Sequence, residues 1–453
     1  MMQMTLKQAA DLLDVKPFDF NGNFSGISID TRTLQKGALF AAIPGERVDG
    51  HDFVEEARAK GAAAALVTRK VESSLPQILV KDITEALGIL SKAWREKFNI
   101  PFIAVTGSNG KTTLKNMIAS ILTAACQGNA LQVLATQGTL NNHLGLPLTL
   151  ARLSATHRYA AIEMGMNHFG EIEYLTKITR PTTAVITNAA ACHLEGVGDL
   201  AGVARAKAEI FLGLAPNGTA VLNRDDAFYH FWREQAGKRP IITFGFHPEA
   251  DVNATLHTST TSQQMTITTP KGSIHVVLPL LGKHNALNAL AATAAAISAG
   301  IELDAIKAGL ENIVPAQGRM QIHTLQNGAK VIDDTYNANP FSLQAAVDTL
   351  AAFAGKRVLV LGDMKELGAD EKNLHQSAGL KIRSAGIDCL FTYGNLTTDT
   401  AHAFGDGAYH FTEQEKLLTA LKPMLQNQTT ILIKGSRSMK MEMVVKGLVG
   451  LSS

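Results

Sequence analysis

Residues Gly107 to Thr113 combine the residue types that bind a triphosphate. Glycines allow backbone N–H groups to converge on phosphate oxygens, Lys111 supplies a cation for the β- and γ-phosphates, and Thr112 offers a hydroxyl to magnesium. An apolar run ending at Val105 precedes this loop and a helical pattern follows it, which is the required strand–loop–helix context. The predicted ATP contacts in the loop are Gly107, Ser108, Asn109, Gly110, Lys111, Thr112 and Thr113.

This phosphate loop departs from the common pattern G-x-x-x-x-G-K-[ST]. Val105 occupies the position five residues before Gly110, where that pattern requires glycine. The shorter form T-G-x-N-G-K-T argues against the common GTPases and transport ATPases. The alternative is a glycine-rich turn without a ligand, which the following Lys-Thr pair disfavours.

Other candidate residues are spread along the next 180 residues. Glu163 and His193 each come just past an apolar strand, and both therefore fall at the carboxyl edge of a parallel sheet, where ligands bind. A buried structural carboxylate and a capping histidine are the alternatives. Lys207 lies on a predicted helix, where a lone lysine is ordinarily a solvated charge. Asn285 and Asn288 share one helix face, although Asn285 also suits a helix N-cap.

Short apolar strands alternate with helices from Ile103 onward, which predicts an α/β fold with a parallel sheet covered by helices. Between Asp251 and Leu281 a Thr-rich alternation around a Pro-Lys-Gly-Ser turn predicts an antiparallel hairpin, inserted at the rim of this sheet. The expected central strands are 102–105, 160–162, 184–186, 220–222 and 241–244.

A second α/β alternation starts near Lys330, after a join marked by Pro315 and Gly318. Its expected strands are 331–332, 358–361, 389–391 and 431–433. We therefore expect three α/β domains: a small N-terminal unit (1–98), a central P-loop ATPase domain (99–315) and a C-terminal Rossmann-like domain (316–453).

The bulk composition agrees with several globular domains and excludes some partners. The chain has 453 residues, 46% of them apolar and 18% charged, and a net charge of only +2. No global field therefore attracts nucleic acid or an anionic membrane. Three widely spaced cysteines indicate neither disulfides nor zinc, and Asp11 and Asp14 interrupt any signal-peptide core. The apolar stretch 286–299 is too short to span a membrane. We expect a cytoplasmic protein without a membrane segment.

Eight further segments, together with the phosphate loop, resemble the Mur ligase family over essentially the whole chain, and within it the MurF type. No single segment decides the resemblance, but their order does. They are SIDTR (28–32), GERVDGHDF (45–53), LNNHLGLP (140–147), EMGMNHFGEI (163–172), HLEGVG (193–198), GKHNALNAL (282–290), DDTYNANP (333–340) and GDMKELG (362–368).

The resemblance implies an ATP- and Mg²⁺-dependent ligase that joins D-alanyl-D-alanine to UDP-N-acetylmuramoyl-tripeptide through an acyl phosphate. The product would be the pentapeptide precursor of peptidoglycan. Independently of the resemblance, we expect a monomer. The family places its P-loop threonine and glutamate on one magnesium ion, here Thr112 and Glu163. It places a histidine and a carbamylated lysine on a second, here His193 and Lys207. The implied catalytic residues are Lys111, His193, Lys207 and Arg319.

The resemblance also implies how the substrates are held. Asn285 and Asn288 would approach the adenine and a nearby phosphate, Arg319 would contact the nucleotide, and Asp334 would take the ribose hydroxyls. The implied UDP contacts are Ser28, Thr31, Arg32, Asp49, Gly50 and His51, for which a plain surface turn is the alternative. The implied dipeptide contacts are Tyr336, Asn337 and Asn339. Lys434 to Arg437 would hold a peptide carboxylate or a phosphate.

Two rival functions remain open from the sequence. Folylpolyglutamate synthase shares the ATP domain of this superfamily but should lack the SIDTR, DGHDF and DDTYNANP segments, all of which are present here. From another class, a P-loop regulatory ATPase would use the same loop to drive a conformational change.

Overall fold

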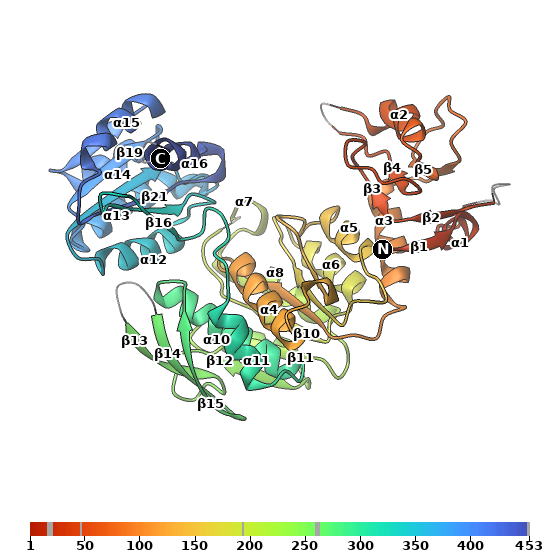
Figure 1. Ribbon diagram of the computed structural model, residues 1–453, viewed down its shortest axis with the longest axis horizontal. Helices are drawn as coiled ribbons and strands as arrows, with labels where there is room; N and C mark the ends of the chain where they lie inside the picture. The colour runs from red at the N-terminus through yellow and green to blue at the C-terminus, as the bar shows by residue number, and fades with distance from the viewer. Residues whose placement is uncertain (16–20, 46–47, 193, 259–262, 451–453) are drawn as a thin grey trace.

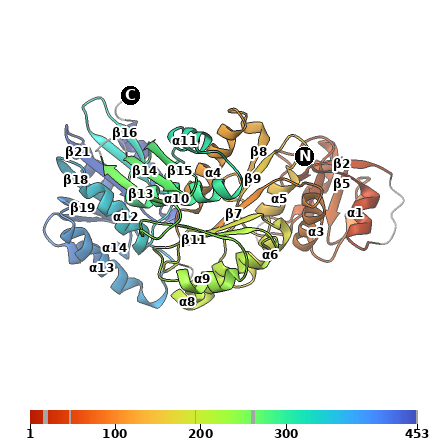
Figure 2. The same cartoon turned by 90° about the horizontal axis from the view of Figure 1, so that it is seen from below.

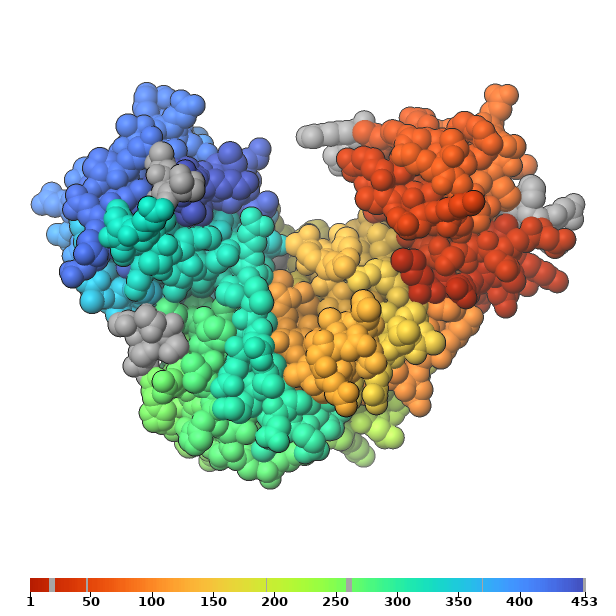
Figure 3. All heavy atoms as spheres, in the orientation of Figure 1, coloured from red at the N-terminus to blue at the C-terminus, as the bar shows by residue number. Residues whose placement is uncertain are grey.

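The computed structural model describes residues 1–15, 21–45, 48–192, 194–258 and 263–450. The chain forms three α/β lobes, with the N-terminal and C-terminal lobes attached to opposite ends of a central one (Figure 1). An open space separates the two outer lobes above the central lobe (Figure 3). The predicted α/β class with three units is confirmed.

The N-terminal lobe is built on four very short parallel strands in the order β3-β4-β5-β6. Strands of two to four residues carry too little periodicity to be recognised, which is why the sequence showed few clear strands here. The elements are β1 (Gln3–Thr5), α1 (Leu6–Leu12), β2 (Asn23–Ser25), β3 (Ile27–Ser28), β4 (Leu39–Ala41), a 3₁₀ turn (Gly50–Phe53), α2 (Val54–Ala59), β5 (Ala64–Val67) and β6 (Gln77–Leu79).

Helix α3 (Ile83–Arg95) joins the N-terminal lobe to the central one. Its apolar face packs in the N-terminal core, while Ser91 Oγ and Trp94 Nε1 donate hydrogen bonds to main-chain carbonyls of the central lobe. The Arg95 guanidinium donates to the carbonyls of Thr179 and Arg180, which end a helix there, and burial lowers the Arg95 pKa to about 10. A buried cation satisfied by carbonyls therefore fixes this joint.

The central sheet has six parallel strands in the order β12-β11-β10-β7-β9-β8. All five predicted strands are present, and the three-residue edge strand β8 was missed. The parallel register pairs Val105 with Glu163 and Thr106 with Ile186, so the carboxyl ends of three strands meet at one edge. The strands are β7 (Phe102–Thr106), β8 (Val133–Ala135), β9 (Tyr159–Glu163), β10 (Thr183–Ile186), β11 (Thr219–Asn223) and β12 (Ile241–Phe244).

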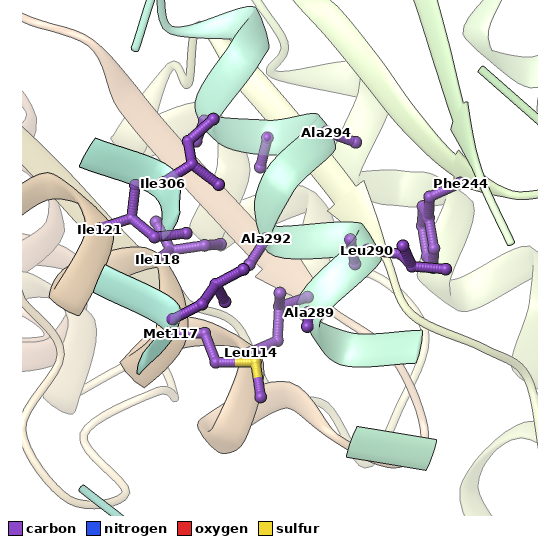
Figure 4. Packing of buried hydrophobic residues seen from close by; sticks show 14 of the residues in the cluster. Leu114, Met117, Ile118, Ile121, Phe244, Ala289, Leu290, Ala292, Ala294 and Ile306 are labelled. Carbon is purple, nitrogen blue, oxygen red and sulfur yellow. The ribbon is translucent and has the colours of Figure 1, made fainter. Parts of the chain in front are cut away.

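Helices cover both faces of the central sheet (Figure 2). On one face lie α4 (Lys111–Ala125), α10 (Lys283–Ser298) and α11 (Leu303–Glu311), whose apolar side chains interdigitate (Figure 4). The other face carries α5 (Gly145–Ala151), α6 (Glu171–Thr179), α8 (Leu200–Ala208) and α9 (Tyr229–Ala236), and α7 (Leu194–Val197) precedes α8.

The predicted hairpin is confirmed and gains a third strand. Strands β13 (Asn253–Thr258), β14 (Gln263–Thr269) and β15 (Gly272–Leu278) form an antiparallel sheet of their own. Its apolar side chains, among them Met265 and Ile267, join the core around α10 and α11. One bridge from Phe244 to Val252 connects this insertion to the edge strand β12, so it lies at the rim of the central sheet as expected.

The C-terminal lobe has a six-stranded sheet in the order β16-β17-β21-β18-β19-β20, of which only β16 is antiparallel. The four inner strands were predicted, whereas the more polar edge strands β16 and β20 were not. The elements are β16 (Gln321–Thr324), β17 (Lys330–Asp334), α12 (Pro340–Ala351), β18 (Lys356–Gly362), α13 (Glu371–Ser384), β19 (Cys389–Tyr393), α14 (Thr397–Phe404), β20 (Ala408–Phe411), α15 (Gln414–Leu421), β21 (Thr429–Lys434) and α16 (Glu442–Val449).

Substituting Gly309 tests the contact that supports the helix behind the phosphate loop. A Cβ at Gly309 on α11 would lie 2.3 Å from Ile121 Cα on α4, so the helices must separate to admit it. We expect Gly309→Ala to lower the free energy of unfolding by about 1–3 kcal/mol in urea denaturation. The exposed Asp304→Ala on the same helix should cost less than about 1 kcal/mol. Equal stability of the two variants would contradict this packing.

Candidate active site

The phosphate loop approaches its neighbours so closely that only glycine fits at two positions. Gly107 has a φ of 149°, and a Cβ there would lie 1.8 Å from Thr187 Oγ1. Gly110 has a φ of 83°, and its Cβ would lie 2.5 Å from Asn288 Oδ1. Gly110 also caps α4, so the loop leads directly into a helix N-terminus, which favours anions. The predicted strand–loop–helix context is confirmed.

The residues that follow β10, Thr187 and Asn188, form hydrogen bonds with the phosphate loop. The N–H groups of Ser108 and Asn109 donate to the carbonyl and the side-chain Oδ1 of Asn188, each over 3.0 Å. Thr187 Oγ1 donates to the Asn109 carbonyl over 2.7 Å. Asn188 was missed by the sequence analysis, although its position just past an apolar strand is the same kind of signal that identified Glu163.

The Lys111 side chain curls over the loop that precedes it. Its Nζ donates to the carbonyls of Gly107 (2.7 Å) and Ser108 (3.3 Å). Burial lowers the Lys111 pKa, and the nearby Glu163 carboxylate opposes that shift. A phosphate oxygen entering the loop would compete with these two carbonyls for the ammonium group. The lysine is therefore placed as a cation for bound phosphate.

Glu163 is the last residue of β9 and not the first residue beyond it, as the sequence had suggested. Its side chain is 2% exposed, and Oε1 accepts a 2.8 Å hydrogen bond from Asn141 Nδ2. The other oxygen, Oε2, is buried and has no hydrogen-bond partner within the described ranges. A buried carboxylate oxygen without a donor is costly unless a cation completes it.

The residues around Glu163 suit a magnesium ion better than a transition metal. Thr112 and Glu163 line the same cavity, and a hydroxyl and a carboxylate are hard oxygen ligands. Across the described part of the chain, no three His, Cys, Asp or Glu side chains form a metal cluster. Any magnesium here would therefore rely on phosphate and water for its remaining ligands. His193, the other predicted ligand, lies outside the described residues.

Lys207 on α8 is buried, contrary to the solvated charge that a helical lysine usually provides. It is 1% exposed, and burial together with the like charge of Lys111 lowers its pKa to about 7. Among the described residues, its ammonium group has no hydrogen-bond or ion-pair partner. Much of Lys207 is therefore a neutral amine at pH 7, which is the form that reacts with electrophiles.

The C-terminal lobe brings Arg319 to the phosphate loop and places Asp334 on the wall of the same cavity. Arg319 Nη2 donates to Thr112 Oγ1 over 3.1 Å, and its guanidinium lies 4.1 Å from the centre of the Tyr336 ring. Asp334 accepts a 2.6 Å hydrogen bond from Lys434, so its carboxylate is already paired with a buried cation. The ring fixes the Arg319 plane, and the arginine is thereby aimed at the loop.

Two of the predicted dipeptide residues also lie beside the phosphate loop. Asn339 Nδ2 donates to Asn109 Oδ1 over 2.9 Å, and Tyr336 supports Arg319. The main-chain carbonyl of Asn337 accepts a 3.0 Å hydrogen bond from Lys434 Nζ. Asn339 and Tyr336 therefore lie on the side of the cavity that faces the phosphate loop.

The two predicted asparagines of α10 are buried behind the loop. Asn285 Nδ2 donates to the Leu281 carbonyl over 2.8 Å, and Asn288 lies against Gly110. Gly282 is the N-cap of α10, so the capping role considered for Asn285 is wrong. The neighbouring His284 was not singled out from the sequence, yet it lines the same cavity and burial lowers its pKa.

The predicted UDP residues lie in the N-terminal lobe, outside this cavity. The Arg32 side chain is 84% exposed and pairs with Asp30 over 2.7 Å. His51 is 1% exposed, and its two ring nitrogens are used by Asp49 and by the N–H of Thr68. His51 therefore shapes the loop and offers no ring nitrogen to a ligand.

The remaining members of this predicted UDP set are also tied into the lobe. The Thr31 carbonyl accepts from Lys60 over 3.0 Å, and Ser28 Oγ donates to the Asp30 carbonyl over 2.9 Å. A Cβ at Gly50 would meet the Ala42 carbonyl carbon at 2.6 Å, which requires glycine there. The turn at Ser28 to Arg32 thus has a defined shape and an exposed cation at its end.

A cavity of about 1350 Å³ lies between the central and C-terminal lobes. The phosphate loop, Glu163 and α10 form one wall, and Arg319, Asp334 and the segment after β21 form the other. Its size and its mixed lining of cations, carboxylates and apolar side chains suit a nucleotide together with a second reactant.

Comparison with known proteins assigns the family. Residues 23–106 match the Mur ligase family catalytic domain, residues 105–296 the Mur ligase middle domain, and residues 318–437 the Mur ligase glutamate ligase domain. The UDP-N-acetylmuramoyl-tripeptide–D-alanyl-D-alanine ligase of Escherichia coli K12 is 44% identical over 454 residues, covering 99% of both chains. This chain belongs to the Mur ligase family.

Solved structures agree with this Mur ligase assignment along the whole chain. A crystal structure of MurF from Acinetobacter baumannii has a TM-score of 0.92 and 35% identity, covering 99% of each chain. MurF of Thermotoga maritima in complex with ADP has a TM-score of 0.84 and 26% identity, covering 94% of this chain and 97% of that one. No helix within the described residues is long and apolar enough to cross a membrane.

The buried Lys207 predicts a pH-dependent stability. Between pH 7 and about 10.5, Lys207 is protonated in the unfolded chain but largely neutral in the folded protein. The free energy of unfolding of the wild type therefore increases as the pH rises through this range. Below pH 7 the full cost of burying the charge remains. We expect Lys207→Met to stabilise the protein by a few kcal/mol at pH 7, and by less at pH 10.

Urea denaturation at both pH values, in buffer free of bicarbonate, measures this difference. The exposed Lys238→Met is the matched control and should change the free energy of unfolding by less than about 0.5 kcal/mol at either pH. A Lys207→Met effect that is the same at pH 7 and pH 10 would contradict the depressed pKa.

Proposed function

We propose that this chain is the ATP-dependent ligase that joins D-alanyl-D-alanine to UDP-N-acetylmuramoyl-tripeptide. The product is the UDP-linked pentapeptide precursor of peptidoglycan, with ADP and phosphate released. The observation that carries this proposal is the 44% identity to the E. coli ligase over 99% of both chains. ATP as the energy source is supported by the phosphate loop and by the ADP bound to the T. maritima relative.

The chemistry requires activation of a carboxylate before an amine attacks it. Transfer of the γ-phosphoryl group to the tripeptide carboxylate forms an acyl phosphate, and the dipeptide amine then displaces phosphate to form the amide. Lys111 and Arg319 supply positive charge from opposite walls of the cavity, where charge develops on the transferring group. Closing of the lobes around the substrates would also keep water from the acyl phosphate.

We assign magnesium to Thr112 and Glu163, and a second magnesium to His193 and a carbamylated Lys207. The buried, unpartnered Glu163 Oε2 and the neutral amine of Lys207 support this assignment. Carbamylation converts that amine into an anion with two oxygens, which relieves the cost of a buried cation. When bound, magnesium neutralises phosphate charge and orients the γ-phosphoryl group.

We place the substrates by lobe. Residues 1–98 bind the UDP end through Ser28, Thr31, Arg32 and the Asp49–His51 turn. Residues 99–315 bind ATP, with Asn285 and Asn288 toward the adenine, and Asp334 of the C-terminal lobe lies toward the ribose. Residues 316–453 bind D-alanyl-D-alanine, for which Lys434 to Arg437 offer cations at the cavity wall. We further propose a monomer that acts in the cytoplasm, where its three free cysteines stay reduced.

A regulatory ATPase or a folylpolyglutamate synthase would behave differently in one assay. Phosphate release should depend on UDP-N-acetylmuramoyl-tripeptide and D-alanyl-D-alanine together, and mass spectrometry should show the pentapeptide. Equal ATP turnover without these substrates would support the regulatory ATPase, and glutamate addition to a folate would support the synthase.

Lys111→Ala should abolish ligation while leaving the UDP substrate bound. The loss removes the cation over the phosphate loop, so we expect kcat to fall by about a thousandfold or more. Calorimetry should show UDP-N-acetylmuramoyl-tripeptide affinity within about twofold of wild type, because the predicted UDP residues lie in another lobe. Loss of both ligation and UDP-substrate binding would mean that the nucleotide and UDP sites are assigned to the wrong lobes.

Glu163→Gln should raise the magnesium requirement. The amide keeps the size and the contact with Asn141 but loses the negative charge that attracts the cation. We expect the Mg²⁺ concentration for half-maximal activity to rise about tenfold or more. The exposed Glu234→Gln is the control and should leave this concentration unchanged. An unchanged magnesium requirement in Glu163→Gln would place the metal elsewhere.

A further inference from the structure

Within the described residues, two side-chain hydrogen bonds join the phosphate loop to the C-terminal lobe: one runs from Arg319 to Thr112 and the other from Asn339 to Asn109. Asn339 Nδ2 donates to Asn109 Oδ1 over 2.9 Å, although the two residues are 230 positions apart in the chain. Asn109 is the third residue of the loop, and Asn339 is the N-cap of α12. The pair therefore couples the position of one lobe to a side chain of the loop.

The capping box of α12 fixes which way both amides face. Asn339 Oδ1 accepts a 2.8 Å hydrogen bond from the Ser342 N–H, and the Asn339 N–H donates to Ser342 Oγ over 3.0 Å. Because Oδ1 is committed to the helix, only Nδ2 of Asn339 can face the loop. Asn109 must therefore accept this hydrogen bond through its side-chain oxygen, and its own Nδ2 points away from Asn339.

The Asn109 Nδ2 is left as a buried donor without a hydrogen-bond partner in the described part of the chain. The Asn109 backbone is fully used, since its N–H pairs with Asn188 and its carbonyl with Thr187. The residue lines the cavity together with Lys111 and Thr112. A buried N–H group beside these residues is satisfied at low cost only by an acceptor that enters the cavity, such as a phosphate oxygen.

We propose that Asn339 is a positioning residue for phosphoryl transfer. By holding Asn109 through its oxygen, it aims Asn109 Nδ2 at the terminal phosphoryl group of ATP. The donor set around that group is therefore complete only when the C-terminal lobe is docked on the loop. Arg319, which reaches Thr112 over 3.1 Å from the same lobe, arrives with the same docking. The inference rests on the proposed ligase function and replaces the dipeptide contact predicted for Asn339.

Asn339→Ser separates the two roles of this residue. Serine is an equally good N-cap, so α12 keeps its cap, but the variant has no amide to hold Asn109. We expect kcat for pentapeptide formation to fall about tenfold or more, because a donor to the transferring group is no longer oriented. ADP, which lacks that group, should bind within about twofold of wild type, and KM for D-alanyl-D-alanine should not change. Asn339→Thr, also a good cap, serves as the second variant.

Ser342→Ala is the matched control, since it removes one half of the capping box and leaves the Asn339–Asn109 hydrogen bond in place. It should lower the thermal midpoint slightly and leave kcat within about twofold. A kcat loss in Ser342→Ala as large as that in Asn339→Ser would show that helix stability is responsible, and would overturn the proposal.

A double-mutant cycle with Asn109→Ala tests whether Asn339 acts through Asn109. If it does, the double variant is no slower than Asn109→Ala alone, because nothing remains to be positioned. Additive losses would overturn the proposal, as would a raised KM for D-alanyl-D-alanine with an unchanged kcat. The ligase function itself is judged on the wild type. If wild type forms pentapeptide and Asn339→Ser forms it equally fast, only the inference fails.

Discussion

The close approach of backbone to side chain at the phosphate loop is the constraint on which the rest of the site depends. The side chains of Thr187 and Asn288 lie so close to Gly107 and Gly110 that neither glycine has room for a Cβ atom. The loop is therefore packed tightly between the segment after β10 and helix α10. Any side chain at either glycine would push one of these elements away. Because α10 also packs on α4 and on the inserted sheet, the position of the loop is set by the core of the whole lobe.

This clamping concentrates like charges and thereby prepares the site for anions. Burial lowers the pKa of both Lys111 and Lys207, and the charge of Lys111 further disfavours the charged form of Lys207, while the nearby Glu163 carboxylate favours the charged form of Lys111. In the absence of ligand this arrangement is costly, since one cation faces carbonyls and one lysine is partly neutral. Phosphate at the loop and an anionic form of Lys207 would both lower that cost. The unfavourable electrostatic energy of these buried groups would therefore be reduced when an anionic substrate binds.

The sequence predicted the parts of the site that depend on local pattern. The loop, the five central strands and the position of Glu163 follow from periodicity and from strand–loop–helix context, whereas Arg319 was named through the resemblance to the family. Asn188 and the pairing of Asn109 with Asn339 depend on how distant segments meet, which no local pattern contains. Strands β8, β16 and β20 were missed because they are short or half-exposed at sheet edges. The sequence also did not reveal that the His51 ring is buried and that both of its nitrogens are used within the lobe.

In the proposed reaction, each of the three lobes contributes a different part of the site. The central lobe holds the phosphate loop rigidly, and the C-terminal lobe contributes Arg319 and Asn339 by docking on it. The N-terminal lobe stands apart across an open space, tethered through α3 (Figure 3). A nucleotide sugar that carries a tripeptide is a long substrate, since each extended residue adds roughly 3.3–3.6 Å. In the arrangement proposed above, its UDP end stays on the outer lobe while its carboxylate reaches the cavity, and the peptide crosses the open space.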